Sequence, residues 1–327
     1  MRIPFAPGAP SPDLFNHCIV RLRLDGASYW LDPTMPAQSG RLPSIFQPHS
    51  GWALPLTREA TGLEELGSDA PLHMLHLEEE ISFGPKPDSP ATLCRHVDHY
   101  SWAADFVRNR FANEGTTEYA RAILKELRQT WPGLVETAPL AISDDQAANR
   151  LRLTLFYEIS DCWKPTDDKR GLGFTTVDAI LSGELTSLKT VTRQTAIHLG
   201  RPRKLTRYVR MNMPCQWAGD GWWHEHEAPG VKYVDRFKID GKVISSSREL
   251  VIGAWSLPAA QASSYADLTG RLSKNVLLVW ARERFGRIRP YKGNWLGIGS
   301  NIGNVFGWIW LAFWIFSVLA MIVRSHR

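Results

Sequence analysis

The sequence predicts an α+β protein that consists mainly of antiparallel β-strands and ends in one transmembrane helix. Two observations predict the strands: alternating apolar and polar runs recur along the chain, and Asp25-Gly26 and Asp240-Gly241, which are typical hairpin turns, join such runs. A third observation predicts the transmembrane helix, because residues 305–323 contain no charged side chain. Strands in series with hairpin turns favour a sandwich-like antiparallel arrangement over an alternating α/β sheet.

The composition of the 327 residues is that of a folded protein, with 44% hydrophobic and 22% charged residues. It excludes a disordered or collagen-like chain. The net charge is +5, but seven basic residues and one acidic residue lie in residues 281–327, so the rest of the chain is close to neutral. Because the positive charge is clustered beside the apolar run, it indicates a lipid bilayer as a partner, and no nucleic acid is expected.

The first predicted element is a hairpin in which residues 15–24 and 27–32 pair around Asp25-Gly26. In the register of a two-residue turn, one face of the hairpin is apolar, and His17 and Asp32 are diagonal neighbours on the other face. The apolar face needs a cover. We expect it to be covered by the later sheets, to be covered by a partner chain, or to be poorly stable alone.

The rest of the chain shows two kinds of periodicity. A helix is predicted at residues 116–131, because Thr116 or Thr117 can cap it and Pro132-Gly133 ends it. Pro258 suits the first turn of a second helix at residues 258–273. Alternation predicts further strands at residues 72–83, 93–106, 149–159, 188–198, 205–213, 231–239 and 243–252.

These elements divide the chain into three parts: a first unit at residues 1–70, a β-rich sandwich-like domain at residues 71–290 and a transmembrane helix at residues 302–323. Basic residues flank the helix on both sides, so they do not decide its orientation. Residues 1–12 lack the apolar core of a secretion signal. The soluble part is therefore expected outside the cytoplasm if an export signal lies upstream, and in the cytoplasm otherwise.

Chemistry is predicted from the pairing of His17 with Asp32. A histidine held by a carboxylate is the base-and-orienter half of a nucleophilic triad, because the carboxylate selects the imidazole tautomer and stabilises its cation. From the residues alone, the alternative is a strand histidine that is satisfied by a neighbouring carboxylate without any catalytic role.

At this hairpin the sequence resembles a known family. Phe15-Asn16-His17 and residues 29–34, which read Tyr-Trp-Leu-Asp-Pro-Thr, are similar to the His and Asp motifs of the transglutaminase-like superfamily. The resemblance continues to about residue 66, and residues 95–163, 189–217 and 231–280 resemble the β-rich C-terminal domain of its bacterial multi-domain branch. It implies a papain-like core with a Cys-His-Asp triad. In complete relatives it implies thiol acyl transfer or amide hydrolysis on peptides or proteins.

In such a protein His17 would be the general base and Asp32 its orienter, with Asn16 and Trp30 as lesser candidates for shaping the site. The family's nucleophilic cysteine lies well upstream of the histidine, whereas no cysteine precedes His17 here. Cys18 does not replace it, because neighbouring strand residues point to opposite faces. The chain as given is therefore expected to be catalytically incomplete, like the C-terminal part of a longer relative.

The leading prediction is a membrane-anchored, bacterial, transglutaminase-like protein that is held in the bilayer through residues 302–323, with a periplasmic soluble part if it is exported. The alternative is a non-enzymatic, membrane-tethered binding or scaffolding module that binds a protein or peptide through its sheet surface or a sheet edge. A third interpretation is that Met1 reflects an interrupted or misassigned reading frame. No cofactor is predicted.

Two histidine clusters were candidates for a metal site. Cys94, His96 and His99 have a metal-ligand spacing, but on a strand His99 faces away from the other two. His224 and His226 share one face of an extended segment but are too few to hold zinc, and a solvated loop is expected there. We therefore predict no metal site.

The remaining polar clusters favour structural interpretations. The basic residues between Arg201 and Arg210 are expected to form a charged solvent face. The four cysteines are widely scattered and indicate no dense disulfide framework.

Overall fold

The computed structural model describes most of the chain between residues 17 and 290, namely residues 17–35, 38–47, 52–66, 70–166, 171–177, 181, 183–185, 188, 190, 192–272 and 276–290. Asn16 and the predicted transmembrane segment at residues 302–323 lie outside these residues. Within the described part, no helix combines the length and the apolar character that crossing a membrane requires.

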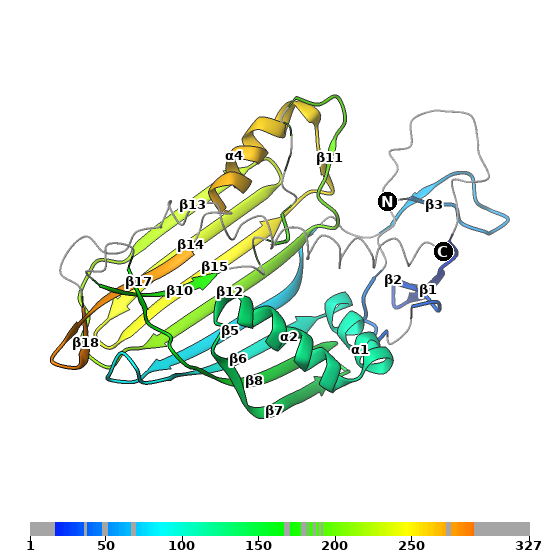
Figure 1. The fold of residues 1–327 in the computed structure, drawn as a ribbon. Helices are drawn as coiled ribbons and strands as arrows, with labels where there is room; N and C mark the ends of the chain where they lie inside the picture. The colour runs from blue at the N-terminus through cyan, green and yellow to red at the C-terminus, as the bar shows by residue number, and fades with distance from the viewer. Residues whose placement is uncertain are drawn as a thin grey trace.

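Eight strands form one large sheet in the order β13-β14-β15-β12-β5-β6-β8-β7 (Figure 1). Neighbouring strands are antiparallel except β12 and β5, which are parallel at the centre. The prediction of an antiparallel sandwich is therefore confirmed only in its coarser form, because the sheet is mixed. The strands are β5 Leu72–Phe83, β6 Ala91–Tyr100, β7 Leu134–Asp145, β8 Arg150–Ile159, β12 Arg203–Asn212, β13 Trp222–Ala228, β14 Val231–Asp240 and β15 Val243–Ile252.

The alternation of residues along these strands gives the sheet two different faces. On β15 every second residue from Ile244 to Ile252 is buried, Ile244, Leu250 and Ile252 among them, whereas the residues that alternate with these are partly exposed. Because successive side chains point to opposite faces, the apolar set lies on one inner face. The outer face carries polar side chains such as Thr206 and Ser247, and none of the described elements covers it.

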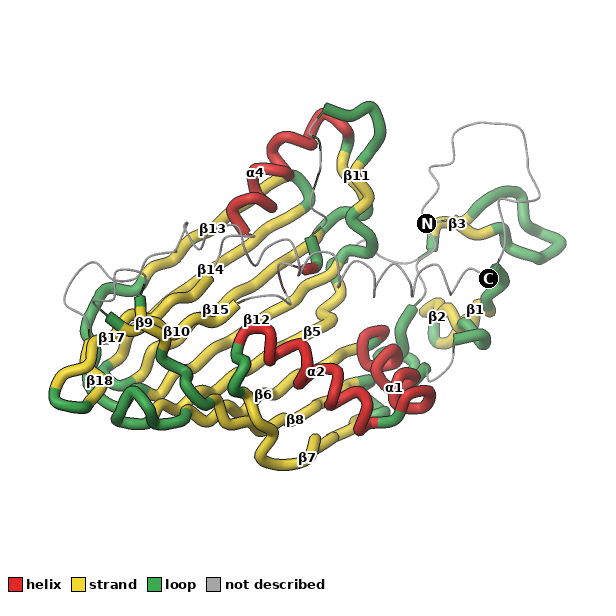
Figure 2. The backbone as a smooth tube through the Cα atoms, in the orientation of Figure 1, coloured by secondary structure: helices red, strands yellow, loops and turns green. Residues whose placement is uncertain are grey.

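Three helices of the described residues cover the inner face. Figure 2 shows α1 (Trp102–Glu114) and α2 (Thr116–Thr130) across the half of the sheet formed by β5 to β8, and α4 (Ala262–Leu272) near β13. They close two apolar cores, one beneath α1 and α2 and one beneath α4. The two predicted helices correspond to α2 and α4. The strand predicted at residues 93–106 is too long, because Ser101 has a φ of 55° and α1 begins directly after it.

A smaller sheet packs on the first core. It consists of β9 (Lys164–Pro165), β10 (Leu172–Val177), β17 (Val276–Arg284) and β18 (Arg287–Pro290), in the order β18-β17-β10-β9. Phe174 of this sheet contacts Phe83 of the large sheet edge-on, with ring centroids 4.8 Å apart. Two sheets thus face each other over part of the core, as in a sandwich.

Two other predicted elements differ from the structure. Among the described residues of the strand predicted at 188–198, only β11 (Ile197–His198) is a strand, and it pairs with β16 (Ser256–Leu257). The loop predicted around His224 and His226 is the edge strand β13, which pairs with β14 over its whole length. Strand formation there depends on the neighbouring β14, because charged residues alone do not favour a strand.

The N-terminal part of the described chain forms two small strand pairs, and the first of them, β1–β2, lies near α1 (Figure 1). β1 (Val20–Leu24) pairs with β2 (Ala27–Leu31), and β3 (Trp52–Ala53) pairs with β4 (Glu64–Glu65). Leu24 lies opposite Ala27 around Asp25-Gly26, whose φ angles of 50° and 79° are those of a tight hairpin turn, so the predicted register is confirmed. The apolar face of this hairpin is not covered by the later sheets: Val20 is 53% and Leu24 46% exposed.

Candidate functional site

His17 and Asp32 lie side by side at the open end of the first hairpin. His17 precedes β1 and Asp32 follows β2, and the register that places Val20 opposite Leu31 brings the two side chains together. The imidazole Nε2 lies 2.7 Å from Oδ2 of Asp32. The predicted contact is therefore present, while a catalytic role for the pair stays a prediction.

Thr34 holds the Asp32 carboxylate in place. Oδ1 of Asp32 accepts hydrogen bonds from the Thr34 backbone N–H at 3.0 Å and from its hydroxyl at 2.6 Å. Burial opposes ionisation of this carboxyl, but the hydrogen bonds from Thr34 and His17 outweigh it and lower the pKa of Asp32. An ionised Asp32 accepts from Nε2–H and leaves Nδ1 of the neutral ring as a proton acceptor. This is the arrangement of a base and its orienter.

The described cysteines do not complete a triad with His17. Cys18 is exposed and directly follows His17, but among the described residues the His17 ring forms no hydrogen bond to a thiol. Cys162 is buried, and burial raises the pKa of its thiol to about 11. The Cys215 thiol donates to the Ile288 carbonyl at 3.4 Å. A nucleophile for His17 therefore does not come from these thiols.

Trp30 lies on the same hairpin face as the pair, opposite Arg21 in the register. The Arg21 guanidinium lies over its indole, 5.3 Å from the ring centroid, and also forms an ion pair with Glu64. In the register of a two-residue turn, Arg21 and Trp30 form a pair without hydrogen bonds between their backbones, so the Trp30 N–H points away from β1. This N–H donates to Oε1 of Gln47 at 2.6 Å. The backbone two residues before Asp32 is thus fixed by Gln47.

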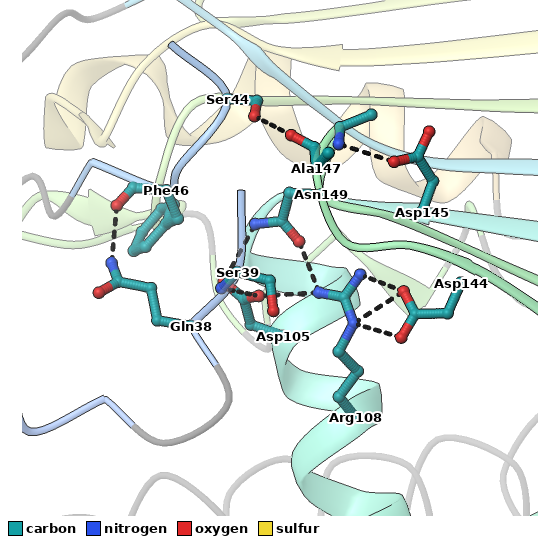
Figure 3. Close-up of polar contacts among 11 residues, drawn as sticks. Gln38, Ser39, Ser44, Phe46, Asp105, Arg108, Asp144, Asp145, Ala147 and Asn149 are labelled. Atoms are coloured by element: carbon teal, nitrogen blue, oxygen red, sulfur yellow. Dashed lines mark hydrogen bonds and ion pairs between the residues drawn. The ribbon is translucent and has the colours of Figure 1, made fainter. Parts of the chain in front are cut away.

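Residues 38–47, called the strap below, join the hairpin to the large sheet. At the start of the strap the Ser39 N–H donates to Oδ1 of Asp105 on α1 at 3.0 Å. Asp105 also accepts from Arg108 at 3.0 Å and from Asn149 at 3.3 Å (Figure 3). Burial raises the pKa of Asp105 in spite of these donors. Arg108 bridges onward to Asp144, so α1, the β7–β8 turn and the strap share one polar cluster.

The middle of the strap lies against the turn between β7 and β8. The Ala147 carbonyl accepts a hydrogen bond from the Ser44 hydroxyl at 2.7 Å (Figure 3). It also accepts one from the Arg41 N–H at 3.1 Å. The Gln38 carboxamide donates to the Phe46 carbonyl at 3.0 Å, so a hydrogen bond joins the start of the strap to its end. The strap is therefore an ordered segment that links the first hairpin to the domain behind it.

Arg201 holds the end of the strap. Its guanidinium lies 4.3 Å from the ring centroid of Phe46 and 5.7 Å from that of Trp255, and its Nη1 donates to the Gln47 carbonyl at 3.2 Å. Burial lowers the pKa of Arg201 to about 10. The prediction of a charged solvent face is wrong here, because the aromatic partners come from segments far away in the sequence.

Arg207 contradicts the prediction of a charged solvent face more strongly than Arg201 does. It is 4% exposed and donates to the Glu79 carboxylate, which also accepts from Arg95 at 2.9 Å. On the neighbouring strands Arg248 donates to Asp235 at 3.3 Å. The sequence does contain a sign of these buried charges. Glu79 occupies an inward-facing position of β5, and the neighbouring inward-facing positions hold apolar residues.

The two candidate metal clusters differ in how the structure places their side chains. Cys94 and His96 share the outer face of the sheet with Sγ and Nε2 3.5 Å apart, whereas His99 is buried on the inner face, as predicted. His224 and His226 lie on one face of β13 with ring centroids 6.3 Å apart. Across the part of the chain that the structure describes, no three His, Cys, Asp or Glu side chains converge as metal ligands.

The outer face of the large sheet contains an open depression of about 290 Å³. It lies over β5, β12 and β15, and its lining includes His76, Glu78, Thr206, Tyr208 and Glu249. His76 Nδ1 and the Thr206 hydroxyl are 2.8 Å apart. Sequence reasoning did not single out this surface, because strands that are distant in the sequence form it.

Comparisons of the chain with protein-family models, with curated proteins and with solved structures find no match.

Proposed function

We propose that this chain is part of a transglutaminase-like thiol acyl-transfer protein in which His17 is the general base and Asp32 its orienter. The observation that carries the proposal is the 2.7 Å contact between Nε2 of His17 and an Asp32 carboxylate whose other oxygen is held by Thr34. Such a carboxylate keeps the imidazole in one tautomer and one orientation, and it stabilises the cation formed when the ring takes a proton.

In the proposed reaction the Nδ1 atom of His17 takes the proton of a cysteine thiol that lies outside these 327 residues, in an upstream part of the protein. The thiolate attacks the carbonyl carbon of a peptide or protein amide, and the imidazolium returns the proton to the leaving nitrogen. Water or an amine then releases the acyl group from sulfur by the same proton transfers in reverse. Without that thiol, the described residues provide only the base, its orienter and the framework that holds them.

The proposal includes a bilayer anchor at residues 302–323 and an amide of a peptide or protein as substrate. A non-enzymatic, membrane-tethered binding or scaffolding module is the second candidate. It is favoured by one observation: the described elements leave the outer face of the large sheet, with its polar depression, uncovered. A flat polar surface of this kind can bind a protein or peptide partner without any chemistry.

The intact mass of the native protein, extracted from its own membranes and detected through its C-terminus, tests the two candidates. A mass well above 36.9 kDa, together with an upstream cysteine that an amide-based electrophile traps, supports the thiol acyl-transfer function. The His17→Gln variant of that larger protein should then trap the electrophile far more slowly. A mass near 36.9 kDa overturns thiol chemistry at this pair and supports the binding module.

A further inference from the structure

The hairpin that carries His17 and Asp32 has few contacts of its own. Its apolar face is exposed at Val20 and Leu24, and it pairs with no strand of the large sheet. A two-stranded hairpin is marginally stable in isolation. The hairpin register brings His17 and Asp32 together, and contacts with the rest of the protein then determine how firmly the backbone of the pair is held.

One chain of contacts leads from the centre of the large sheet to this hairpin. Arg201 lies two residues before the start of β12, one of the two central strands, and donates from Nη1 to the Gln47 carbonyl. The Gln47 carboxamide accepts from the Trp30 N–H at 2.6 Å. Trp30 lies two residues before Asp32, so both point to the same face of β2, and a shift of the Trp30 backbone moves the carboxylate that orients His17.

We propose that Arg201 is a positioning residue for the His17–Asp32 pair and acts through Gln47 and the backbone of Trp30. The proposal rests on the base-and-orienter function proposed above. A guanidinium suits this role, because its flat face stacks on Phe46 while its edge donates a directed hydrogen bond. Phe46 is 4% exposed, so the stack is a packed contact and not a surface encounter.

The test uses the full chain and two nuclear magnetic resonance readouts. The first is the exchange rate of the Trp30 amide with solvent, which reports the bond to Gln47. The second is the exchange rate of the low-field Nε2–H proton of His17, which reports the bond to Asp32. The His17→Gln variant assigns that proton, and Asp32→Asn sets the value for a pair without its carboxylate.

We expect Arg201→Ala and Gln47→Ala each to speed exchange at both positions about tenfold, the effect of losing one hydrogen bond. Arg210→Ala is the matched control. Arg210 lies on the same strand, β12, where it is exposed and donates to Asn212. We expect it to leave both rates at the wild-type value.

Two results would overturn the proposal in distinguishable ways. If Asp32→Asn changes the His17 proton but Arg201→Ala and Gln47→Ala do not, the pair stands and Arg201 does not position it. If Asp32→Asn leaves the proton unchanged, the base-and-orienter function fails as well. Gln47→Ala decides the question even if Arg201→Ala does not fold, because it removes the carboxamide link and leaves the stacked guanidinium in place.

Discussion

Arg207 on β12 donates hydrogen bonds of 2.9 Å and 2.5 Å to Oε2 of Glu79 on β5. The two strands form the parallel pair at the centre of the large sheet. Burial opposes ionisation of Glu79, but Arg207 and then Arg95 outweigh it and lower its pKa. A carboxylate thus stays charged in the middle of the core because two guanidinium groups surround it.

Removing this carboxylate should be strongly destabilising. We expect Glu79→Ala to lower the free energy of unfolding by about 3–5 kcal/mol, because Arg95 and Arg207 then remain buried without it. Glu80→Ala, at the next and exposed position of β5, should change stability by less than about 1 kcal/mol. Urea unfolding of both variants measures the difference, and equal effects would contradict the buried ion pair.

Stability should fall in mild acid because of His99. Burial is the main cause that lowers the pKa of His99 to about 4, with Asp98 opposing and Arg95 adding to it. Between pH 6.5 and 4 the unfolded chain binds a proton that the folded chain excludes, so the free energy of unfolding decreases as the pH falls. We expect a loss of up to about 3 kcal/mol.

Urea unfolding at neutral pH and at about pH 4.5 checks this pH dependence. We expect His99→Gln to be less sensitive to acid across this window, and the exposed His198→Gln to behave like the wild type. An unchanged acid sensitivity in His99→Gln would show that other groups cause it.

The exposed hairpin face gives a test of whether another segment covers it. Leu24 is 46% and Leu77 1% exposed. We expect Leu77→Ala to cost about 2–5 kcal/mol and Leu24→Ala less than about 1 kcal/mol. Denaturant unfolding of both variants measures this. A cost above 2 kcal/mol at Leu24 would mean that a partner chain or a segment outside the described residues packs on the hairpin.

The strap should loosen when its first contact is removed. We expect Asp105→Ala to speed hydrogen exchange of the Ser39 amide, which loses its 3.0 Å acceptor, by about tenfold. Asp144→Ala is the control, because Asp144 pairs with Arg108 but not with the strap. Exchange measured on peptides of the strap and of β8 should change only in the strap and only for Asp105→Ala.

The sequence by itself determined the local geometry of this protein. Asp25-Gly26 sets the hairpin register, because a two-residue turn leaves one pairing and side chains alternate with a period of two. The contact between His17 and Asp32 follows from that register. β5 and β15 were predicted at their observed bounds for the same reason, since alternation is visible within each strand.

Only the tertiary structure decided which strands became neighbours and which cations were buried. β5 and β12 are separated by more than one hundred residues, and no local pattern indicates that they pair in parallel. Arg201 and Arg207 look like surface residues in the sequence, yet Phe46 and Glu79 bury them from distant segments. The energy of burying a charge depends on partners that only the folded chain brings together, so the framework behind the pair could not be predicted from the sequence.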